Sequence, residues 1–285
     1  MKLRFDYEHL SMSENPAVIF RGIVGSHAYG TANVASDTDI RGVFVVPSRE
    51  YVRLVAPPKQ VSDVRNDRTY YSLLRFCELM AEANPTTMEM LYLPAECVLK
   101  TTSAFELLVK NREMFISQRA VESHLGYAVS QIKKARGCNK RVWNPWPEEP
   151  PRRECYADVG AYQHAFKEHR QYWEWKRNRN EARLVQQERG ELDYDAKNMM
   201  HLTRLLFSGE NIVKNGEPIV RFEGEKLETL LSIRRGEWTF DEIMAHAEKI
   251  QAEIESGKGR LPVESDKAKI DELIAEVMNE AGVKG

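Results

Sequence analysis

The chain has 285 residues, 42% hydrophobic and 29% charged, which suits one large domain or two ordinary ones of a soluble globular enzyme. It contains no apolar run long enough to cross a membrane and no secretory leader, and its formal net charge of −2 gives no global support for nucleic-acid binding. The four cysteines lie far apart with no Cys-x-x-Cys pair, which argues against a zinc knuckle and fits a reducing cytoplasm: Cys77, Cys97, Cys138 and Cys155.

In chain order, the first third of the sequence predicts a small head of strands and helices. Alternating apolar residues indicate its strands, and Asn84-Pro85 ends its main helix because proline cannot continue one. Residues 48–59 are polar and contain proline, which predicts a loop. We expect strands at 18–24, 38–47 and 68–73, and helices at 73–83 and 87–93.

The rest of the sequence predicts a helical body. A Pro- and Trp-rich stretch at 136–153 is expected to be a loop that crosses the surface. The overall expectation is an α+β protein with a small mixed-sheet head at residues 1–112 and a helical domain at residues 113–285. We expect helices at 104–131, 156–183, 195–206, 241–255 and 267–279, with Asp195 as an N-cap.

The first two predicted strands carry residues suited to phosphate and metal chemistry. Gly25-Ser26 lies where the first strand turns, and a glycine there lets backbone amides approach a phosphate. Asp37 and Asp39 are two residues apart, so their side chains point the same way along a strand. Adjacent carboxylates repel each other unless a cation intervenes, and hard oxygen ligands favour Mg²⁺. This pattern predicts phosphoryl or nucleotidyl transfer.

The joint spacing of Gly25-Ser26 and Asp37-x-Asp39 resembles the nucleotidyltransferases of the DNA polymerase β superfamily. The wider motifs are similar to one branch, the RNA-ligase-associated polymerase-β-like proteins associated with RNA repair, and those outside the Gly-Ser and Asp-x-Asp core have no assigned chemistry. The resemblance covers residues 20–250. The motifs of the branch lie at 25–30, 36–43, 84–91, 194–206 and 236–239.

The resemblance implies a third carboxylate that binds a metal ion and helps to activate the attacking hydroxyl. The candidates are Asp63, Asp67 and Glu89, and Asp67 is favoured because it opens the third predicted strand, next to the Asp pair. We therefore expect Asp37, Asp39 and Asp67 to be the catalytic and metal-binding residues. The implied cofactors are two Mg²⁺ ions, with Mn²⁺ as an alternative, and the implied substrate is an NTP.

The nucleotide is expected to bind at the glycine turn and at a row of basic side chains. Gly25 and Ser26 would hold the β- and γ-phosphates of the NTP. Arg41 lies on the same strand face as the Asp pair, where it either contacts phosphate or pairs with a carboxylate. A helical row at i, i+4 and i+7 is either a phosphate-binding row or a solvated face: Lys197, His201 and Arg204.

Two basic segments with interleaved aromatic residues predict a nucleic-acid surface on the helical body. Basic side chains neutralise phosphates, and aromatic rings stack on bases. The alternative is a core stripe of aromatic residues beside a solvated basic face. The candidate residues are Lys133, Lys134, Arg136, Lys140, Arg141, Lys176, Arg177 and Arg179.

These features predict a cytoplasmic enzyme that transfers NMP from an NTP to the 3′ end of an RNA such as tRNA, with release of pyrophosphate. One alternative is nucleotidylation of a protein hydroxyl, as in toxin-type relatives, which usually lack a long basic helical body. Another is modification of a small molecule, for which the head shows no clear acidic cluster. A non-catalytic binding module is disfavoured by the intact pair of Asp37 and Asp39.

Overall fold

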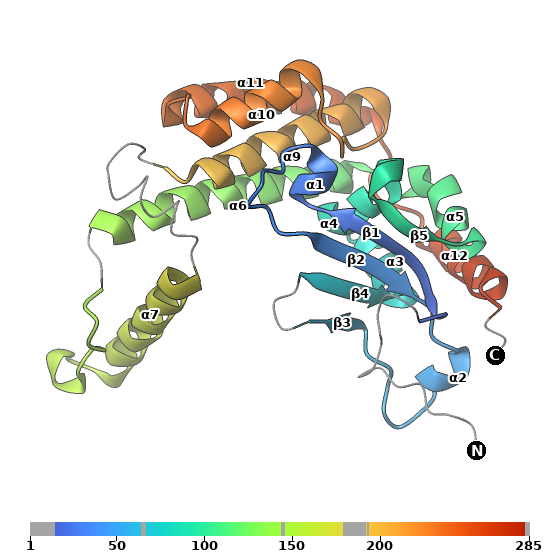
Figure 1. Ribbon diagram of the computed structural model, residues 1–285, viewed down its shortest axis with the longest axis horizontal. Coiled ribbons are helices and arrows are strands. Elements are labelled where there is room, and N and C mark those ends of the chain that lie inside the picture. The colour runs from blue at the N-terminus through green and yellow to red at the C-terminus, as the bar shows by residue number, and fades with distance from the viewer. Residues whose placement is uncertain (1–14, 64–66, 144–145, 179–191, 193, 283–285) are drawn as a thin grey trace.

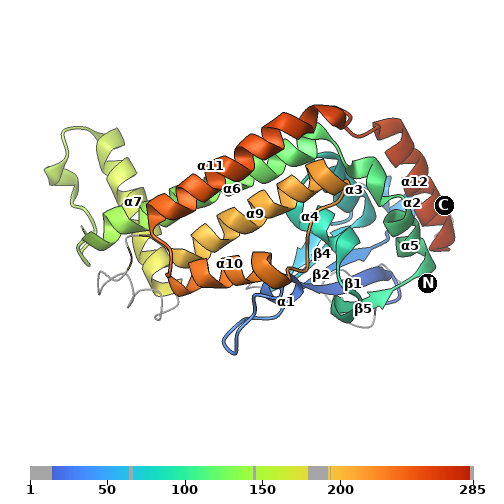
Figure 2. The same ribbon diagram turned by 90° about the horizontal axis from the view of Figure 1, so that it is seen from above.

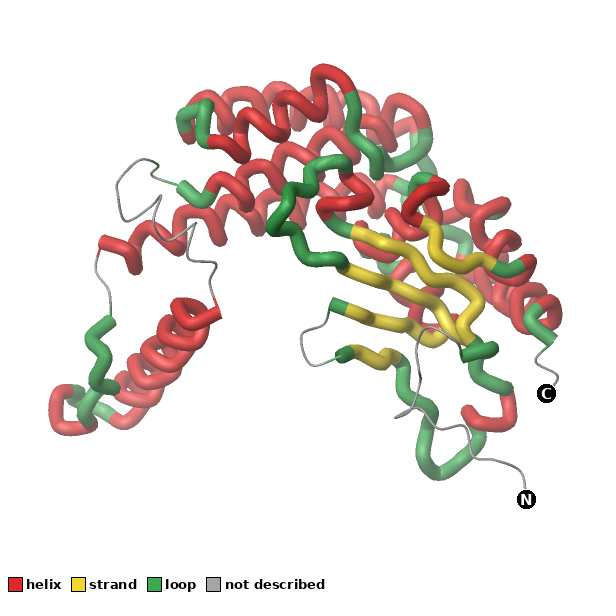
Figure 3. Tube along the Cα trace, in the orientation of Figure 1, coloured by secondary structure: helices red, strands yellow, loops and turns green. Residues whose placement is uncertain are grey.

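The computed structural model of the chain describes residues 15–63, 67–143, 146–178, 192 and 194–282 (Figure 1). A five-stranded mixed sheet forms the N-terminal part, and helices make up most of the rest (Figure 3). The predicted α+β class, with a mixed-sheet head followed by a helical region, is confirmed.

The sheet contains the three predicted strands and two that were not predicted. The five strands are β1 Val18–Val24, β2 Asp39–Phe44, β3 Gln60–Ser62, β4 Arg68–Ser72 and β5 Val98–Thr101. Their order is β3-β4-β2-β1-β5, with β2 and β4 parallel and the other three pairs antiparallel. The strands that were missed, β3 and β5, lie at the two edges and are too short to show a clear alternation of side chains.

Short helices are interspersed with the strands of the N-terminal part. They are α1 Ser26–Tyr29, α2 Ser48–Tyr51, α3 Leu73–Ala81, α4 Pro85–Glu89 and α5 Ser103–Lys110. Both α3 and α5 pack on the sheet. Asn84 caps α4, because its side chain accepts hydrogen bonds from the backbone amides of Thr86 and Thr87. The predicted break at Asn84-Pro85 therefore separates α3 from α4.

The helical part is organised around one long central helix pair. Its helices are α6 Gln118–Trp143, α7 Val159–Asn178, α9 Ala196–Asn215, α10 Gly224–Arg235, α11 Phe240–Gly257 and α12 Lys267–Glu280. Helix α9 packs against α6, α10 and α11 (Figure 2). Asp195 caps α9 as predicted, since its side chain accepts a hydrogen bond from the backbone amide of Asn198. Helix α10 was not predicted.

The predicted loop at 136–153 begins later than expected. Helix α6 continues to Trp143, because Gly137 only weakens a helix, whereas the first proline of this stretch is Pro145. The described residues after it fold back on α7, where Nε2 of His169 and Nε1 of Trp173 each lie 2.9 Å from the carbonyl oxygen of Pro147. Of the helix predicted at 156–183, the part beyond residue 178 lies outside the described residues.

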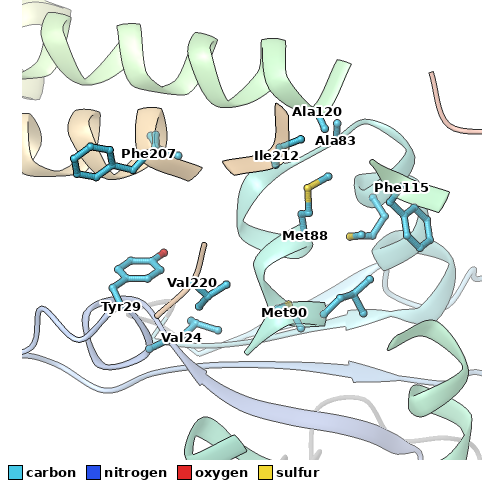
Figure 4. Close-up of a cluster of buried hydrophobic side chains, with 14 of the residues drawn as sticks. Val24, Tyr29, Ala83, Met88, Met90, Phe115, Ala120, Phe207, Ile212 and Val220 are labelled. Carbon is cyan, nitrogen blue, oxygen red and sulfur yellow. The ribbon is translucent and has the colours of Figure 1, made fainter. Parts of the chain in front are cut away.

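One continuous buried cluster joins the head to the helical part. It includes Phe20, Phe76 and Phe105 from the head and Leu205 and Ile250 from the helices. Figure 4 shows its middle, where side chains from the sheet, α4, α6 and α9 meet. The buried cluster crosses the division expected between residues 112 and 113, which stays a prediction, and α12 returns to pack on α3 and α5. None of the helices in the described part of the chain combines the length and apolarity needed to span a lipid bilayer.

The return of α12 to the head generates a stability prediction. Leu273 is buried against this cluster, so Leu273→Ala is expected to lower the free energy of unfolding by about 2–5 kcal/mol through lost burial and the cavity left behind. Chemical denaturation followed by circular dichroism measures the change. Glu272→Ala, at an exposed neighbouring position of α12, is the matched control and should change the stability by less than about 0.5 kcal/mol. Equal effects of the two variants would show that α12 is not docked on the head.

Candidate active site

The turn between β1 and α1 requires glycine at its first position. Gly25 has φ 69° and ψ −145°, a backbone conformation that residues with a side chain rarely adopt. A β-carbon built at this position would lie 2.8 Å from Oδ2 of Asp39. The strand register explains the contact, since Val24 of β1 is paired with Asp39 of β2. The sequence motif therefore reflects a close approach between the turn and the carboxylate.

The start of β2 brings two predicted catalytic residues together. Asp39 is the first residue of β2, and Asp67 directly precedes the parallel strand β4. The backbone amide of Ile40 donates a hydrogen bond of 2.7 Å to the carbonyl oxygen of Asp67. Arg41 donates to the same carbonyl at 3.2 Å, and its guanidinium lies 3.9 Å from the Asp39 carboxylate. Of the two roles expected for Arg41, the structure thus shows pairing with a carboxylate.

Several charges converge on Asp39. Burial raises the pKa of the Asp39 carboxyl above its usual value, although the side chain remains partly exposed. The neighbouring guanidinium of Arg41 opposes this increase in pKa. The carboxylates of Asp67 and Asp37 raise the pKa further, and the ammonium of Lys197 lowers it. The ionisation of Asp39 therefore depends on charged groups from its own strand, from the residue before β4 and from the first turn of α9.

The three candidates for the third carboxylate have different surroundings. Asp67 is close enough to affect the pKa of Asp39. Asp63 is not among the described residues that affect this pKa. Asp63 follows β3, and its backbone amide donates to the carbonyl oxygen of Arg68. Glu89 is buried in an internal ion pair with Arg204. The surroundings of Asp67 match those expected of the third carboxylate, so it remains the favoured prediction.

Arg204 lies inside the protein and does not extend the row of Lys197 and His201 along the surface of α9. Its guanidinium pairs with Oε1 of Glu89 and stacks 3.9 Å from the ring centre of Tyr29. The Tyr29 hydroxyl donates a hydrogen bond of 2.7 Å to Oε2 of Glu89. Burial alone would lower the pKa of Arg204, but the adjacent Glu89 and Tyr29 hold it above its usual value. The nucleotide-binding role predicted for Arg204 is therefore replaced by an internal contact.

Contacts that the sequence did not predict hold the polypeptide after Gly25 against the helical part. The backbone amide of Phe222 donates to the carbonyl oxygen of Tyr29 at 3.1 Å. Arg221 donates to the carbonyl oxygen of His27 at 3.1 Å, and Arg234 donates to that of Thr31. Arg234 lies two residues before the motif at 236–239, but nothing in a sequence motif indicates a bond to a distant backbone carbonyl.

The predicted nucleic-acid surface falls mostly where side chains are not described. Lys134 on α6 is exposed. The other predicted residues lie outside the described side chains, and for Arg179 outside the described backbone: Lys133, Arg136, Lys140, Arg141, Lys176, Arg177 and Arg179. Their role therefore stays a prediction.

The fold and its motifs define a class, which comparison with known proteins confirms. The mixed-sheet head, with its Gly-Ser turn beside the Asp pair, is the feature that indicated the polymerase β superfamily. The sequence pattern of the RlaP family, described as the RNA repair pathway DNA polymerase beta family, matches residues 5–276. The chain belongs to this family.

One phage protein is similar to part of the chain. A protein of Enterobacteria phage T4, named "Uncharacterized 38.9 kDa protein in nrdC-mobD intergenic region", is 29% identical over 128 residues. The match covers 41% of this chain and 38% of the phage protein, so the chain spans well under half of that relative's length. No solved structure is significantly similar to this one.

The contact between Gly25 and Asp39 generates a second prediction. Gly25→Ala is expected to lower the free energy of unfolding by about 2–3 kcal/mol, because it combines an unfavourable φ with a clash against the carboxylate. Gly216→Ala is the comparison variant, since Gly216 also has a positive φ but open space around it, and about 1–2 kcal/mol is expected. Thermal and urea denaturation measure both.

A double variant separates the effect of the carboxylate contact from that of the backbone conformation. In Asp39→Ala protein, the additional Gly25→Ala change should cost less than it does in the wild type, because Oδ2 of Asp39 is absent. An unchanged cost in this background would mean that the backbone conformation alone requires glycine.

Proposed function

We propose that this protein is a Mg²⁺-dependent nucleotidyltransferase that transfers NMP from an NTP to the 3′ hydroxyl of an RNA, such as a tRNA, in RNA repair. The family supports a polymerase-β-like role in RNA repair. The observation that carries the proposal is the close approach of the Asp39 carboxylate to Gly25 at the turn after β1, beside the backbone of Asp67. A phosphate-binding turn and an acidic cluster at one place suit the transfer of a phosphoryl-linked group.

The acidic residues provide the kind of oxygen ligands that Mg²⁺ prefers. Carboxylate oxygens are hard donors, and the raised pKa of Asp39 reflects burial and like charges that a divalent cation would offset. Within the described part of the chain, no three Asp, Glu, His or Cys side chains already stand together as a metal site. We propose that Asp37, Asp39 and Asp67 hold the ions, which supply charge compensation for the triphosphate and a lower pKa for the acceptor hydroxyl.

The chain's own residues would orient the reactants and move one proton. Gly25 and Ser26 would hold the β- and γ-phosphates through backbone amides and the serine hydroxyl, with Lys197 and His201 beside them. The acceptor oxygen bonds to the α-phosphorus while the bond to the bridging oxygen breaks, and pyrophosphate leaves with that electron pair. The hydroxyl proton would pass to Asp67 and then to solvent.

A labelling experiment tests the proposed reaction. The protein, Mg²⁺ and each α-labelled NTP in turn are incubated with total RNA and total protein, and both pools are resolved on gels. Label is expected on RNA, and Asp37→Asn with Asp39→Asn should reduce its incorporation about 100-fold or more, because the charges that balance the triphosphate are lost. Circular dichroism checks that the double variant remains folded.

The pool that carries the label decides between acceptors. Label on protein alone would replace RNA by a protein hydroxyl as the acceptor. Incorporation that persists in the double variant would overturn the proposed mechanism.

A matched pair of variants tests which residue provides the third carboxylate. Asp67→Asn is expected to reduce incorporation about 100-fold and to raise the Mg²⁺ concentration needed for half-maximal rate. Asp63→Asn, at the other end of the segment between β3 and β4, should change neither by more than about twofold. A stronger effect of Asp63→Asn than of Asp67→Asn would reassign the third ligand. The rate as a function of Mg²⁺ concentration measures both.

A further inference from the structure

Three motifs of the RNA-repair branch meet at one buried point. Tyr29 belongs to the motif at 25–30, Glu89 to that at 84–91 and Arg204 to that at 194–206. Each is largely excluded from solvent, with exposed fractions of 7%, 3% and 6%. In Figure 4 the ring of Tyr29 extends from α1 into the layer between the sheet and α9. We call these three residues the internal triad.

Each residue of the internal triad contacts the other two, and these contacts are directional. Glu89 accepts a hydrogen bond from Tyr29 on one carboxylate oxygen and pairs with Arg204 through the other. The guanidinium of Arg204 lies over the Tyr29 ring, so each member contacts the other two. A planar guanidinium and a two-oxygen carboxylate accept only a narrow range of geometries, unlike an apolar contact. The triad therefore sets the relative placement of its three segments.

The segments that the internal triad joins carry the proposed nucleotide-binding groups. Tyr29 is the last residue of α1, and Ser26 is the first residue of that helix. Arg204 lies two turns after Lys197 on α9, a separation of about 10 Å along the helix axis. The internal triad therefore connects the helix that begins with Ser26 to the helix that carries Lys197.

We propose that Tyr29, Glu89 and Arg204 are positioning residues that fix the Gly25-Ser26 turn relative to Lys197, so that triphosphate binding depends on their polar contacts. This inference rests on the proposed function and goes further, because it assigns the three motifs to one task. A merely structural triad could be replaced by apolar side chains without loss of nucleotide affinity, since buried ion pairs are often replaceable in this way. A positioning triad could not.

Two proteins separate the two roles. The first replaces the whole triad by apolar residues of similar size, Tyr29→Phe with Glu89→Leu and Arg204→Met, which leaves no buried group of the triad unpaired. The second is Leu273→Ala, which loses stability at α12 and leaves the triad intact. The measurements are thermal unfolding, KM and kcat for the NTP that the wild type incorporates, and Kd for its analogue with a methylene group between the α- and β-phosphates.

The expected result is a crossed pattern. The apolar triad should unfold at a temperature near that of the wild type, yet its KM and Kd should rise at least about tenfold, a usual loss when a supporting contact behind a binding group is removed. Leu273→Ala should unfold at a lower temperature and keep both values within about twofold. Tyr29→Phe alone, which removes one hydrogen bond, should raise KM about threefold to tenfold.

Other patterns overturn the inference in distinguishable ways. If the apolar triad is folded and binds the analogue as the wild type does, the triad is only structural. If the apolar triad fails to fold, Tyr29→Phe alone decides, and an unchanged KM and Kd in that variant reject positioning. If the wild type neither binds nor incorporates any of the four NTPs, the proposed function itself fails, and the inference fails with it.

Discussion

The buried ion pair between Glu89 and Arg204 joins α4 of the head to the long helix α9, and much of the architecture depends on it. Charges this far from solvent are stable only with complete partners, and loss of one partner costs about 3–5 kcal/mol. Tyr29 adds a second partner for Glu89, since burial raises the pKa of its hydroxyl and keeps it a neutral donor. The turn after β1, helix α4 and helix α9 must therefore assemble together, and the head has no complete interior without the helical part.

A second constraint acts at the opposite end of α1, where the chain packs a carboxylate against a glycine. The pairing of β1 with β2 leaves no room for a side chain at Gly25, so Asp39 lies at the edge of the turn. Burial raises the pKa of Asp39, and the neighbouring carboxylates raise it further, so a charged carboxylate at this place is unfavourable by itself. Such local cost is typical of places where a ligand supplies the missing positive charge, and the proposed Mg²⁺ is a ligand of that kind.

The helical part contributes to the candidate site through more than one helix. Helix α9 brings Lys197 to the acidic cluster, and Arg221 and Arg234 hold carbonyl oxygens of the segment that follows the turn. The Tyr194 hydroxyl donates to the carbonyl oxygen of Trp238, which links the motif at 194–206 to that at 236–239. Motifs that lie far apart in the sequence thus contact one another in the folded chain.

The sequence alone determined the elements whose signals are local. Apolar patterns predicted β1, β2 and β4, Asn84-Pro85 marked the end of α3, Asp195 placed the start of α9, and the Gly-Ser and Asp-x-Asp spacing indicated the family. Only the tertiary structure decided what depends on distant partners: the edge strands β3 and β5, the return of α12 to the head, and the burial of Arg204. Its spacing with Lys197 and His201 suggested one helix face, but a charge pattern does not reveal whether a carboxylate 115 residues earlier will pair with it. Short edge strands and buried ion pairs are stabilised by their neighbours in space, which local sequence does not specify.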